Sequence, residues 1–568
     1  GSKHLFYYNQ FLVATCRNKA KFGTITTTIE KLFYRWADPF PETIEQLSEY
    51  CYPQKTYFTD SEGNDDEDIS QEIRTSPNDQ QRLVHGMLKP LNLLSIIRTF
   101  SIWTTDSNGK MIRVVGRYQQ LRAVKKTVDR LLTGVNRDER GGIIWHTQGS
   151  GKSLTMVFLI REMYLHPHLQ SYKVVLLTDR AQLDDQIKET AQSVGYTVND
   201  PANIDKLKKE LRTNTSEIVS CMIHKFQEKD YLASFPELNT SENILVLTDE
   251  AHRSQYTKLG ANLDKALPNA TRIAFTGTPI ERTENTFGEY IDKYTMRQAI
   301  KDGVTLEIVY EGKTHDAGVE DQSGADQKFQ DVFKDYNITE QAEILAYGTR
   351  RAYLESLETI NQKARDMLRH YAKQVFPNGY KAQIVCVSKE AAHRYKLALD
   401  VAIVELKEEL KAGSDLKISL ENFEKLKADV IISDVNHNDA PHLKNYADGK
   451  GRKLAIAGFK LPFGKQETLN DDEEVKANGD IGILIVVDML LTGFDAPIEQ
   501  VMYLDKVIVN HNLLQAIARV NRVYDDDKQV GFVVDYVGMG NHMKKALDAY
   551  WEKEQQEITG CLKDNAEL

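Results

Sequence analysis

The sequence has no long hydrophobic run, few cysteines and no excess of positive charge. Its longest apolar stretch begins at Ile481 and stops at Asp488, far short of the ~20 residues that span a bilayer. The five cysteines are scattered and form no C-x-x-C pair, which fits a reducing compartment and excludes a disulfide framework or a thiolate zinc site. The formal net charge of -11 gives no overall basic footprint and by itself disfavours a nucleic-acid partner. Any metal chemistry must therefore use oxygen ligands, and no membrane partner is expected.

The chain does have ample length and an ordinary globular composition. Its 568 residues are 41% hydrophobic and 27% charged, which at roughly 150 residues per domain suggests about three or four domains. It begins Gly1-Ser2 without a methionine, so we expect it to be cut from something longer. Aromatic and threonine-rich residues from His4 to about Trp36 predict strands of an incomplete sheet.

Short apolar runs alternate with helical segments in two regions, the first of which starts at about Gly141. Such alternation predicts parallel sheets with helices on both faces. The predicted fold class is therefore α/β, with two doubly wound parallel-sheet lobes in tandem. The strand-like runs are 141–146, 173–179, 217–223, 244–250 and 272–278 in the first region, and 382–388, 429–434, 481–488, 500–505 and 530–537 in the second.

The strongest local motif is HTQGSGKS, which follows a strand-like run and precedes a helical one. Glycines let backbone N–H groups approach phosphates, the lysine reaches the β- and γ-phosphates, and the serine binds Mg²⁺. His146 stands where the strict G-x-x-x-x-G-K-S pattern has its first glycine, so a glycine-rich strand-to-helix turn is the alternative interpretation. The residues expected to bind nucleotide here are Gly149, Ser150, Gly151, Lys152, Ser153 and Leu154.

Two further motifs end strand-like runs. TDEAH places Asp249 and Glu250 at a strand's carboxyl end, where Asp249 suits a Mg²⁺ site and Glu250 suits a general base for the attacking water. A carboxylate pair that caps a helix is the alternative. TGTP supplies Thr276 and Thr278, whose hydroxyls suit sensing of the γ-phosphate or a nucleic-acid contact, although a simple turn has the same appearance.

The second region carries VVDMLLTGFDAP, residues 486–497, followed by LLQAIARVNRVY. Gln515, Arg519 and Arg522 fall at i, i+4 and i+7, a spacing that predicts one helical face. Arginines on such a face can act as fingers that stabilise the charge of a transferring phosphoryl group. A salt-bridged surface helix is the alternative interpretation.

In order and spacing, these motifs resemble those of superfamily 2 nucleic-acid helicases and translocases. Their amino-acid sequences are similar to those of the motor (R, restriction) subunit of type I restriction-modification enzymes. The similarity extends from about Arg117 to Val537. The resemblance implies two RecA-like lobes that bind ATP and Mg²⁺ in the cleft between them, hydrolyse the ATP and pump double-stranded DNA. The segments that carry it are IIWHTQGSGKSLTM, LLTDRAQLDDQ, LTDEAHRSQY, AFTGTPI and LLTGFDAP followed by LLQAIARVNR.

The resemblance also implies roles for residues outside the main motifs. Gln119 matches the glutamine that reads adenine, although a solvent-facing helix residue is the alternative interpretation. Gly493 and Asp495 match nucleotide-contacting positions. Modification (methyltransferase) and specificity subunits are the implied protein partners, in the cytoplasm of a bacterium or archaeon. The family's Asp and Glu-x-Lys nuclease motif has no convincing strand-borne counterpart. The residues that match DNA-contacting or coupling segments are Arg180, Lys225, Thr276, Thr278, Lys389 and Gln515.

Two functions other than a restriction motor stay open. A stand-alone superfamily 2 DNA repair helicase would share the motifs, as would a nucleotide-gated DNA-binding scaffold that hydrolyses little ATP. The expected segments are 1–110, a remnant of an N-terminal nuclease-linked domain with a linker; 111–300, the first motor lobe; 301–375, a connecting segment; 376–540, the second motor lobe; and 541–568, the start of a C-terminal helical region.

Overall fold

The chain divides into two compact units, Gly1–Thr305 and Leu306–Leu568, each of which is described by itself. No helix within the parts of the chain described is long and apolar enough to cross a membrane. The computed structural model describes residues 9–16, 18–52, 76–105, 111–178, 188, 190–192, 195–227, 235–249, 255–277, 281–313, 354–414, 416, 418–437, 439–468, 476–491, 494–508, 511–537 and 562–564.

The first unit is built on a seven-stranded sheet in which every pairing is parallel. Side chains of one strand alternate between two buried faces: Val174 and Leu176 pack with α6, whereas Val175 and Leu177 pack with α8 and α9. Burial on both faces explains why these strands are apolar without interruption. The strand order is β11 (Tyr290–Tyr294), β5 (Gly142–His146), β10 (Thr271–Thr276), β9 (Ile244–Asp249), β6 (Lys173–Thr178), β8 (Ile218–Met222) and β7 (Val198–Asn199).

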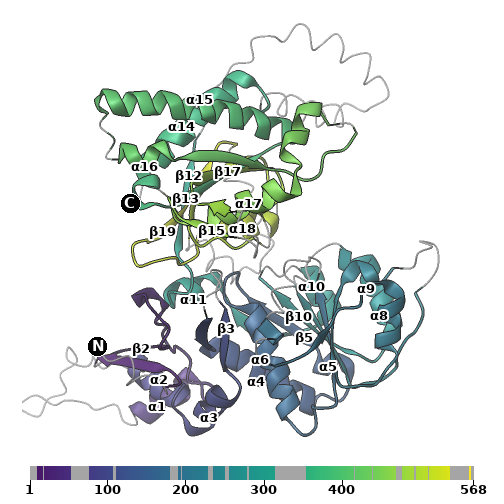
Figure 1. The fold of residues 1–568 in the computed structure, drawn as a ribbon. Helices are drawn as coiled ribbons and strands as arrows, with labels where there is room; N and C mark the ends of the chain where they lie inside the picture. The colour runs from purple at the N-terminus through teal and green to yellow at the C-terminus, as the bar shows by residue number, and fades with distance from the viewer. Residues whose placement is uncertain are drawn as a thin grey trace, which may run out of the picture. The chain divides into compact units, whose positions relative to one another are not determined.

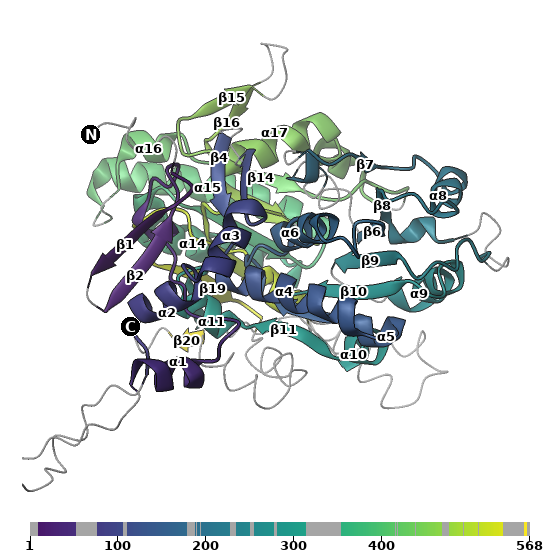
Figure 2. The ribbon, with the colours of Figure 1, turned by 90° about the horizontal axis from the view of Figure 1, so that it is seen from below.

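Helices cover both faces of this sheet, and α4 and α6 pack side by side on one of them (Figures 1 and 2). The chain enters α6 through Gly151, a left-handed residue that acts as the N-cap. The helices of the first sheet are α4 (Tyr118–Thr133), α5 (Arg137–Arg140), α6 (Lys152–Leu165), α8 (Ile204–Leu211), α9 (Gln255–Ala266), α10 (Glu281–Phe287) and α11 (Met296–Lys301).

The N-terminal residues pack onto the first unit and share its core. Phe22, Trp36 and Phe100 belong to the same hydrophobic cluster as Ile144 and Phe158. Strands were expected in this region, and β1 (Leu12–Cys16) and β2 (Lys19–Gly23) form a short antiparallel pair. The other elements of this region are α1 (Ile44–Cys51), α2 (Asp79–Gly86), α3 (Pro90–Arg98), β3 (Ser101–Thr105) and β4 (Met111–Val115).

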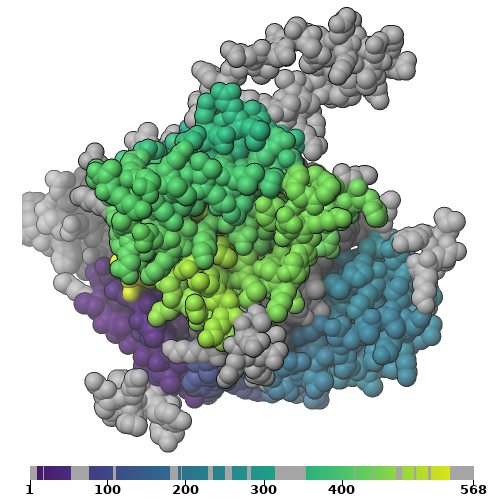
Figure 3. Space-filling model, turned by 45° about the horizontal axis from the view of Figure 1, so that its top comes forward, coloured from purple at the N-terminus to yellow at the C-terminus, as the bar shows by residue number. Residues whose placement is uncertain are grey.

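The second unit repeats the parallel architecture with its own seven-stranded sheet. Helices α14 (Leu357–Gln374) and α15 (Lys389–Gly413) lie on one side of this sheet, and α17 (Gly449–Lys460) lies on the other (Figure 1). In Figure 3 the described residues of the second unit are coloured from teal-green to yellow. The strand order is β14 (Lys427–Ile431), β17 (Ile481–Val486), β13 (Lys381–Cys386), β18 (Glu499–Asp505), β19 (Val530–Asp535), β12 (Glu307–Gly312) and β20 (Leu562–Asp564).

A buried ion pair joins α14 to the end of β18 in the second unit. The Lys363 ammonium lies 2.6 Å from one Asp505 oxygen, and the Tyr395 hydroxyl of α15 donates to the other at 2.7 Å. Such a pair offsets its desolvation only because both carboxylate oxygens are bonded. The smaller elements of this unit are α16 (Leu420–Glu424), α18 (His511–Ile517), and the hairpin of β15 (Gln466–Thr468) with β16 (Lys476–Asn478).

The predicted α/β fold with two parallel sheets is confirmed, with two local differences. Strand β12 falls within the segment expected to connect the lobes, yet it is hydrogen-bonded between β19 and β20 and is part of the second sheet. Helix α14, from the same segment, contributes Met367 and Tyr371 to the core of the second unit. At the C-terminal end, Leu562–Asp564 form a strand beside β12 rather than helix. Residues 314–353 and 538–561 lie outside the described residues.

Candidate nucleotide site

A glycine-containing loop links the carboxyl end of β5 to the start of α6. Gly149 and Gly151 have φ of 81° and 89°, in the left-handed region that side chains disfavour. The Ser150 hydroxyl donates to the Thr147 carbonyl at 2.6 Å and closes the turn. No side chain caps the N-terminus of α6, so its first N–H groups point into the loop as an anion-binding end. The predicted strand, loop and helix context is present around these residues.

Lys152, the first residue of α6, folds its side chain back over the loop. Its ammonium donates to the His146 carbonyl at 3.3 Å. A Cβ added to Gly277 would lie 3.1 Å from this ammonium, so the lysine sits directly beside the end of β10. Ser153 and Leu154 follow in the first helical turn and are half-buried. The ammonium therefore lies between the start of the loop and the end of β10.

The carboxyl ends of three strands bring the other predicted residues to the same edge. β10 lies between β5 and β9, with Thr276 opposite Trp145 and Phe275 opposite Asp249. Thr276 and Asp249 are both buried at the ends of their strands. Two of the predicted residues at this edge, Glu250 and Thr278, lie outside the described residues.

Two neighbouring glutamines of α4 differ in their surroundings. Gln119, the predicted adenine reader, is fully buried, and its amide atoms have no hydrogen-bond partner within the described part of the chain. An unsatisfied buried amide is costly, which fits a residue awaiting a polar ligand. Gln120 instead donates to the Gly151 carbonyl at 3.0 Å and accepts from the Arg117 N–H. It ties α4 to the loop, a role that the sequence analysis missed although both residues stand in RYQQ.

The face predicted for Gln515, Arg519 and Arg522 is wrong as a single helical face. α18 ends at Ile517, and only Gln515 belongs to it. After the helix, Val520 packs against Gly531 at the start of β19, where an added Cβ would lie 2.5 Å from the Val520 carbonyl. The next carbonyl accepts a hydrogen bond from Leu306 at 2.6 Å. Packing against β19 and the residue before β12 therefore overrides the helical periodicity.

The two arginines are nevertheless held by the LLTGFDAP segment, residues 490–497. The buried Arg519 guanidinium donates to the Leu491 carbonyl at 3.3 Å and also to the Phe494 carbonyl. Arg522 pairs with Asp495 at 2.6 Å, and their side chains are 21% and 45% exposed. Arg522 is thus the arginine of the two that can exchange its partner for an incoming group. Gly493 lies outside the described residues.

Glu499, which the sequence analysis did not single out, is a buried carboxyl near these arginines. Burial raises its pKa to about 7, against the opposing charges of Arg519, Lys528 and Arg522. Both side-chain oxygens lack a hydrogen-bond partner within the described residues. No motif marks this position, because its neighbours meet only in the folded sheet.

The pKa of Glu499 predicts a pH effect on stability. The folded carboxyl keeps its proton up to about pH 7, whereas the unfolded one loses it near the ordinary value of 4.5. Between these values the folded state binds more protons, so its stability falls by up to about 1.4 kcal/mol per pH unit as the pH rises. Glu499→Gln should flatten this dependence in urea unfolding between about pH 5 and pH 7. Equal slopes for the variant and the parent chain would contradict the assignment.

The lysines predicted to contact DNA are engaged with neighbours of their own unit. The Lys225 ammonium donates to the Pro201 carbonyl at 2.7 Å, and that of Lys389 lies 2.7 Å from Asp439. A phosphate contact at either lysine has to compete with these partners. Arg180 lies outside the described residues, so its role stays a prediction.

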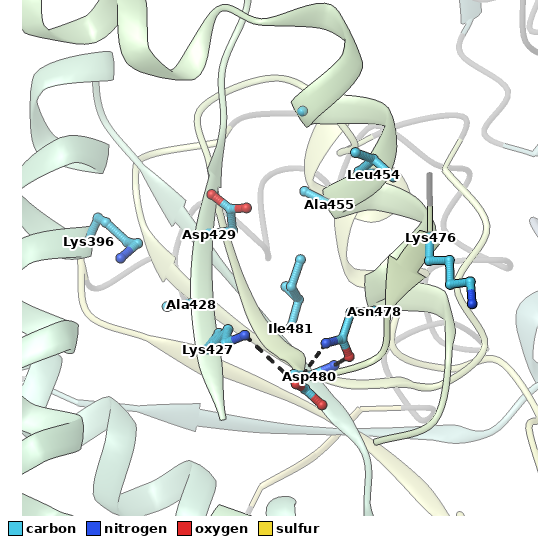
Figure 4. A pocket seen from close by; sticks show the side chains of 11 residues that line it. Lys396, Lys427, Ala428, Asp429, Leu454, Ala455, Lys476, Asn478, Asp480 and Ile481 are labelled. Atoms are coloured by element: carbon cyan, nitrogen blue, oxygen red, sulfur yellow. Dashed lines mark hydrogen bonds and ion pairs between the residues drawn. The ribbon is translucent and has the colours of Figure 1, made fainter. Parts of the chain in front are cut away.

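A pocket of about 320 Å³ in the second unit contains none of the predicted residues. Figure 4 shows it between α15, α17 and the starts of β14 and β17. Two of its charged side chains pair with each other: Lys427 lies 3.8 Å from Asp480, and Asn478 donates to the same carboxylate at 2.9 Å.

Comparison with known protein families gives two adjacent matches. Residues 119–342 match the family described as SWI2/SNF2 ATPase. Residues 378–538 match the family described as type I restriction enzyme subunit R domain 3. The first match contains the loop and the carboxyl edge of β9, and the second contains the arginines.

Curated relatives and a solved structure agree with these matches. The type I restriction enzyme HindI endonuclease subunit of Haemophilus influenzae is 30% identical over 96% of this chain and 48% of its own length. The putative MjaIXP endonuclease subunit of Methanocaldococcus jannaschii is 28% identical over 98% of this chain and 50% of its own length. A fragment of a putative HsdR subunit from Vibrio vulnificus YJ016 shares the fold, with a TM-score of 0.50, 17% identity and coverage of 84% of this chain and 72% of that one.

The first unit thus combines a parallel sheet, a glycine-containing loop before α6 and a buried aspartate at the same sheet edge with a match to the SWI2/SNF2 ATPase family. The second match and the relatives add what the second unit resembles. Residues 378–538 are similar to domain 3 of the R subunits of type I restriction enzymes, and the two curated relatives are named as endonuclease subunits of such enzymes. It spans about half the length of the curated relatives it matches.

Proposed function

We propose that this chain is an ATP-dependent motor that translocates along double-stranded DNA as part of a type I restriction enzyme. The proposal rests on one observation: Lys152, Thr276 and Asp249 all lie at the edge of the first sheet where neighbouring strands have their carboxyl ends. Ligands of open parallel sheets bind at the carboxyl ends of the strands. A phosphate-binding lysine and a buried carboxylate at that edge suit the hydrolysis of ATP.

Each residue of the first unit has a proposed part in that hydrolysis. The N–H groups of the loop and the Lys152 ammonium hold the phosphates, and the Gln119 amide reads the adenine. Ser153 and Asp249 would hold Mg²⁺, which supplies positive charge at the phosphate oxygens when bound. Glu250 would orient the attacking water and accept its proton. Thr276 would report the state of the γ-phosphate to the rest of the lobe.

The second unit supplies the proposed arginine finger and coupling residues. Arg522, already paired with one carboxylate, is proposed to stabilise the transferring phosphoryl charge, with Arg519 holding the segment that positions it. Gln515 of α18 is proposed to couple ATP hydrolysis to movement along the DNA. We propose that the protein alternates between an open and a closed state during ATP turnover. If the two states bind the DNA backbone with different affinity, ATP turnover shifts their populations and drives steps along the duplex.

The proposed partners follow the family. Modification and specificity subunits would select the DNA site, and this chain would move the duplex through Lys225, Lys389, Arg180 and Thr278. Relatives are bacterial and archaeal proteins, and the proposed compartment is the cytoplasm. DNA cleavage is proposed for a nuclease domain that is largely absent from these residues.

ATP turnover with and without linear duplex DNA tests the motor. We expect the duplex to raise the rate of ATP hydrolysis severalfold, because DNA binding favours the closed state. Stimulation should weaken as salt rises, since phosphate contacts release counterions. ATP turnover that DNA does not raise at low salt would contradict the motor, and little turnover with or without DNA would favour a nucleotide-gated scaffold.

Strand displacement distinguishes the motor from a repair helicase. A translocase on duplex DNA should displace a third strand from a triplex in the presence of ATP and leave a partial duplex paired. Unwinding of the partial duplex would favour a stand-alone helicase. Omission of ATP, with Mg²⁺ retained, is the control for spontaneous triplex loss.

A further inference from the structure

A buried carboxylate in the first unit collects hydrogen bonds from three side chains around the phosphate loop. Asp292 of β11 accepts from His146 Nε2 at 2.9 Å, from Arg122 at 2.7 and 2.9 Å, and from Lys126 at 3.1 Å. The side chains of His146 and Asp292 are 0% and 1% exposed. A buried carboxylate persists only when it is bonded in this way, so the cluster is a fixed feature of the unit.

The charges within this cluster are set by burial and by the partners. Burial lowers the pKa of His146, and the hydrogen bond with Asp292 only partly opposes that shift. Burial alone would raise the pKa of Asp292, but the hydrogen bond from His146 and the charge of Arg122 outweigh it. The imidazole is therefore neutral and donates its Nε2–H to a charged carboxylate. This bond fixes both the tautomer and the orientation of the ring.

His146 is also the last residue of β5 and the first of the loop motif. Its carbonyl accepts the hydrogen bond from the Lys152 ammonium at 3.3 Å. The next residue, Thr147, donates its N–H to the Tyr294 carbonyl of β11 at 2.9 Å. Side chain and backbone thus anchor the start of the loop to the same neighbouring strand. Displacement of His146 would shift the carbonyl that holds the lysine.

We propose that His146 is a positioning residue, which through Asp292 sets the place of the loop and of Lys152 at the nucleotide phosphates. This inference rests on the proposed ATP site. It gives a physical reason for a histidine where the strict motif has a glycine. A glycine there lacks the side-chain bond to Asp292, so only backbone contacts with β11 would hold the strand end.

Three substitutions of His146 test the proposal through ADP binding and ATP turnover. His146→Leu fills the space and removes the donor, while Asp292 keeps Arg122 and Lys126, so no charge is left unpaired. We expect the Kd for ADP and the KM for ATP to rise about tenfold, which is about 1.4 kcal/mol. His146→Gln keeps an N–H donor and should recover most of the affinity. His146→Gly, which restores the strict motif, should resemble the leucine variant.

The comparison between these variants separates positioning from stability. A merely structural role predicts a lower unfolding midpoint with unchanged KM at temperatures where the protein is folded, and that result would overturn the proposal. Equal impairment of the leucine and glutamine variants, or full activity of the glycine variant, would overturn it as well. Lys152→Ala measured alongside tests the ATP site: if that variant hydrolyses ATP normally, the proposed function itself fails. Lys125→Ala, which removes an ammonium 2.6 Å from Glu162, is the matched control.

Discussion

Lys152→Ala should reduce ATP turnover by about 10²–10³-fold, the loss expected when one charged donor to a developing phosphoryl charge is removed. In the free protein this ammonium makes its hydrogen bond to the His146 carbonyl, at 3.3 Å. A long bond of this kind contributes little to folding. Alanine is also a good residue for the start of α6. The loss should therefore appear in phosphate binding and catalysis and should leave the unfolding midpoint nearly unchanged.

Steady-state ATP turnover with saturating linear duplex measures the effect, with ADP binding recorded on the same samples. Lys125→Ala serves as the control, because its ammonium pairs with Glu162 between α4 and α6 and not with the loop. The control should keep the turnover of the parent chain. Normal turnover in Lys152→Ala would show that the loop between β5 and α6 is a structural turn, the alternative that the sequence left open.

The sequence predicted the parts of the site that lie at strand ends. The apolar runs of β5, β9 and β10 are uninterrupted because both faces of a parallel sheet are buried, and each motif begins where such a run stops. Parallel strands place their carboxyl ends at one edge. Residues far apart in the chain, such as Lys152, Asp249 and Thr276, could therefore be grouped before any contact was known.

The parts that the sequence did not predict depend on tertiary pairing. The periodicity of residues 511–522 is helical, yet the chain leaves α18 after Ile517 because Val520 packs on β19. The residues of β12 were predicted to be part of a connection, because their sequence does not indicate that they pair with β19. Asp292 pairs with His146 across neighbouring strands, and an isolated aspartate in YIDKY carries no motif. In each case the deciding contact joins residues whose register only the folded sheet defines.

Arg522→Ala should lower the turnover number by about 10³-fold or more, the effect of removing an arginine finger, while the KM for ATP changes little. The two arginines differ in what else they do. Arg519 is buried and donates to the carbonyls of Leu491 and Phe494, so its loss would also leave these acceptors without a donor. Arg522 pairs with the half-exposed Asp495, and breaking such a pair costs little stability.

The finger is therefore identified by comparing kinetics with stability across a set of variants. Arg519→Ala should lower both the turnover number and the unfolding midpoint, whereas Arg522→Ala should lower the turnover number alone. Arg522→Lys keeps the charge without the planar fork and should recover only part of the rate. Arg365→Ala is the matched control, because Arg365 also pairs with a carboxylate, that of Glu405, and both side chains lie on the surface, 48% and 50% exposed. If Arg522→Ala turns over ATP like this control, Arg522 is a surface ion-pair residue and the finger must be sought elsewhere in the second unit.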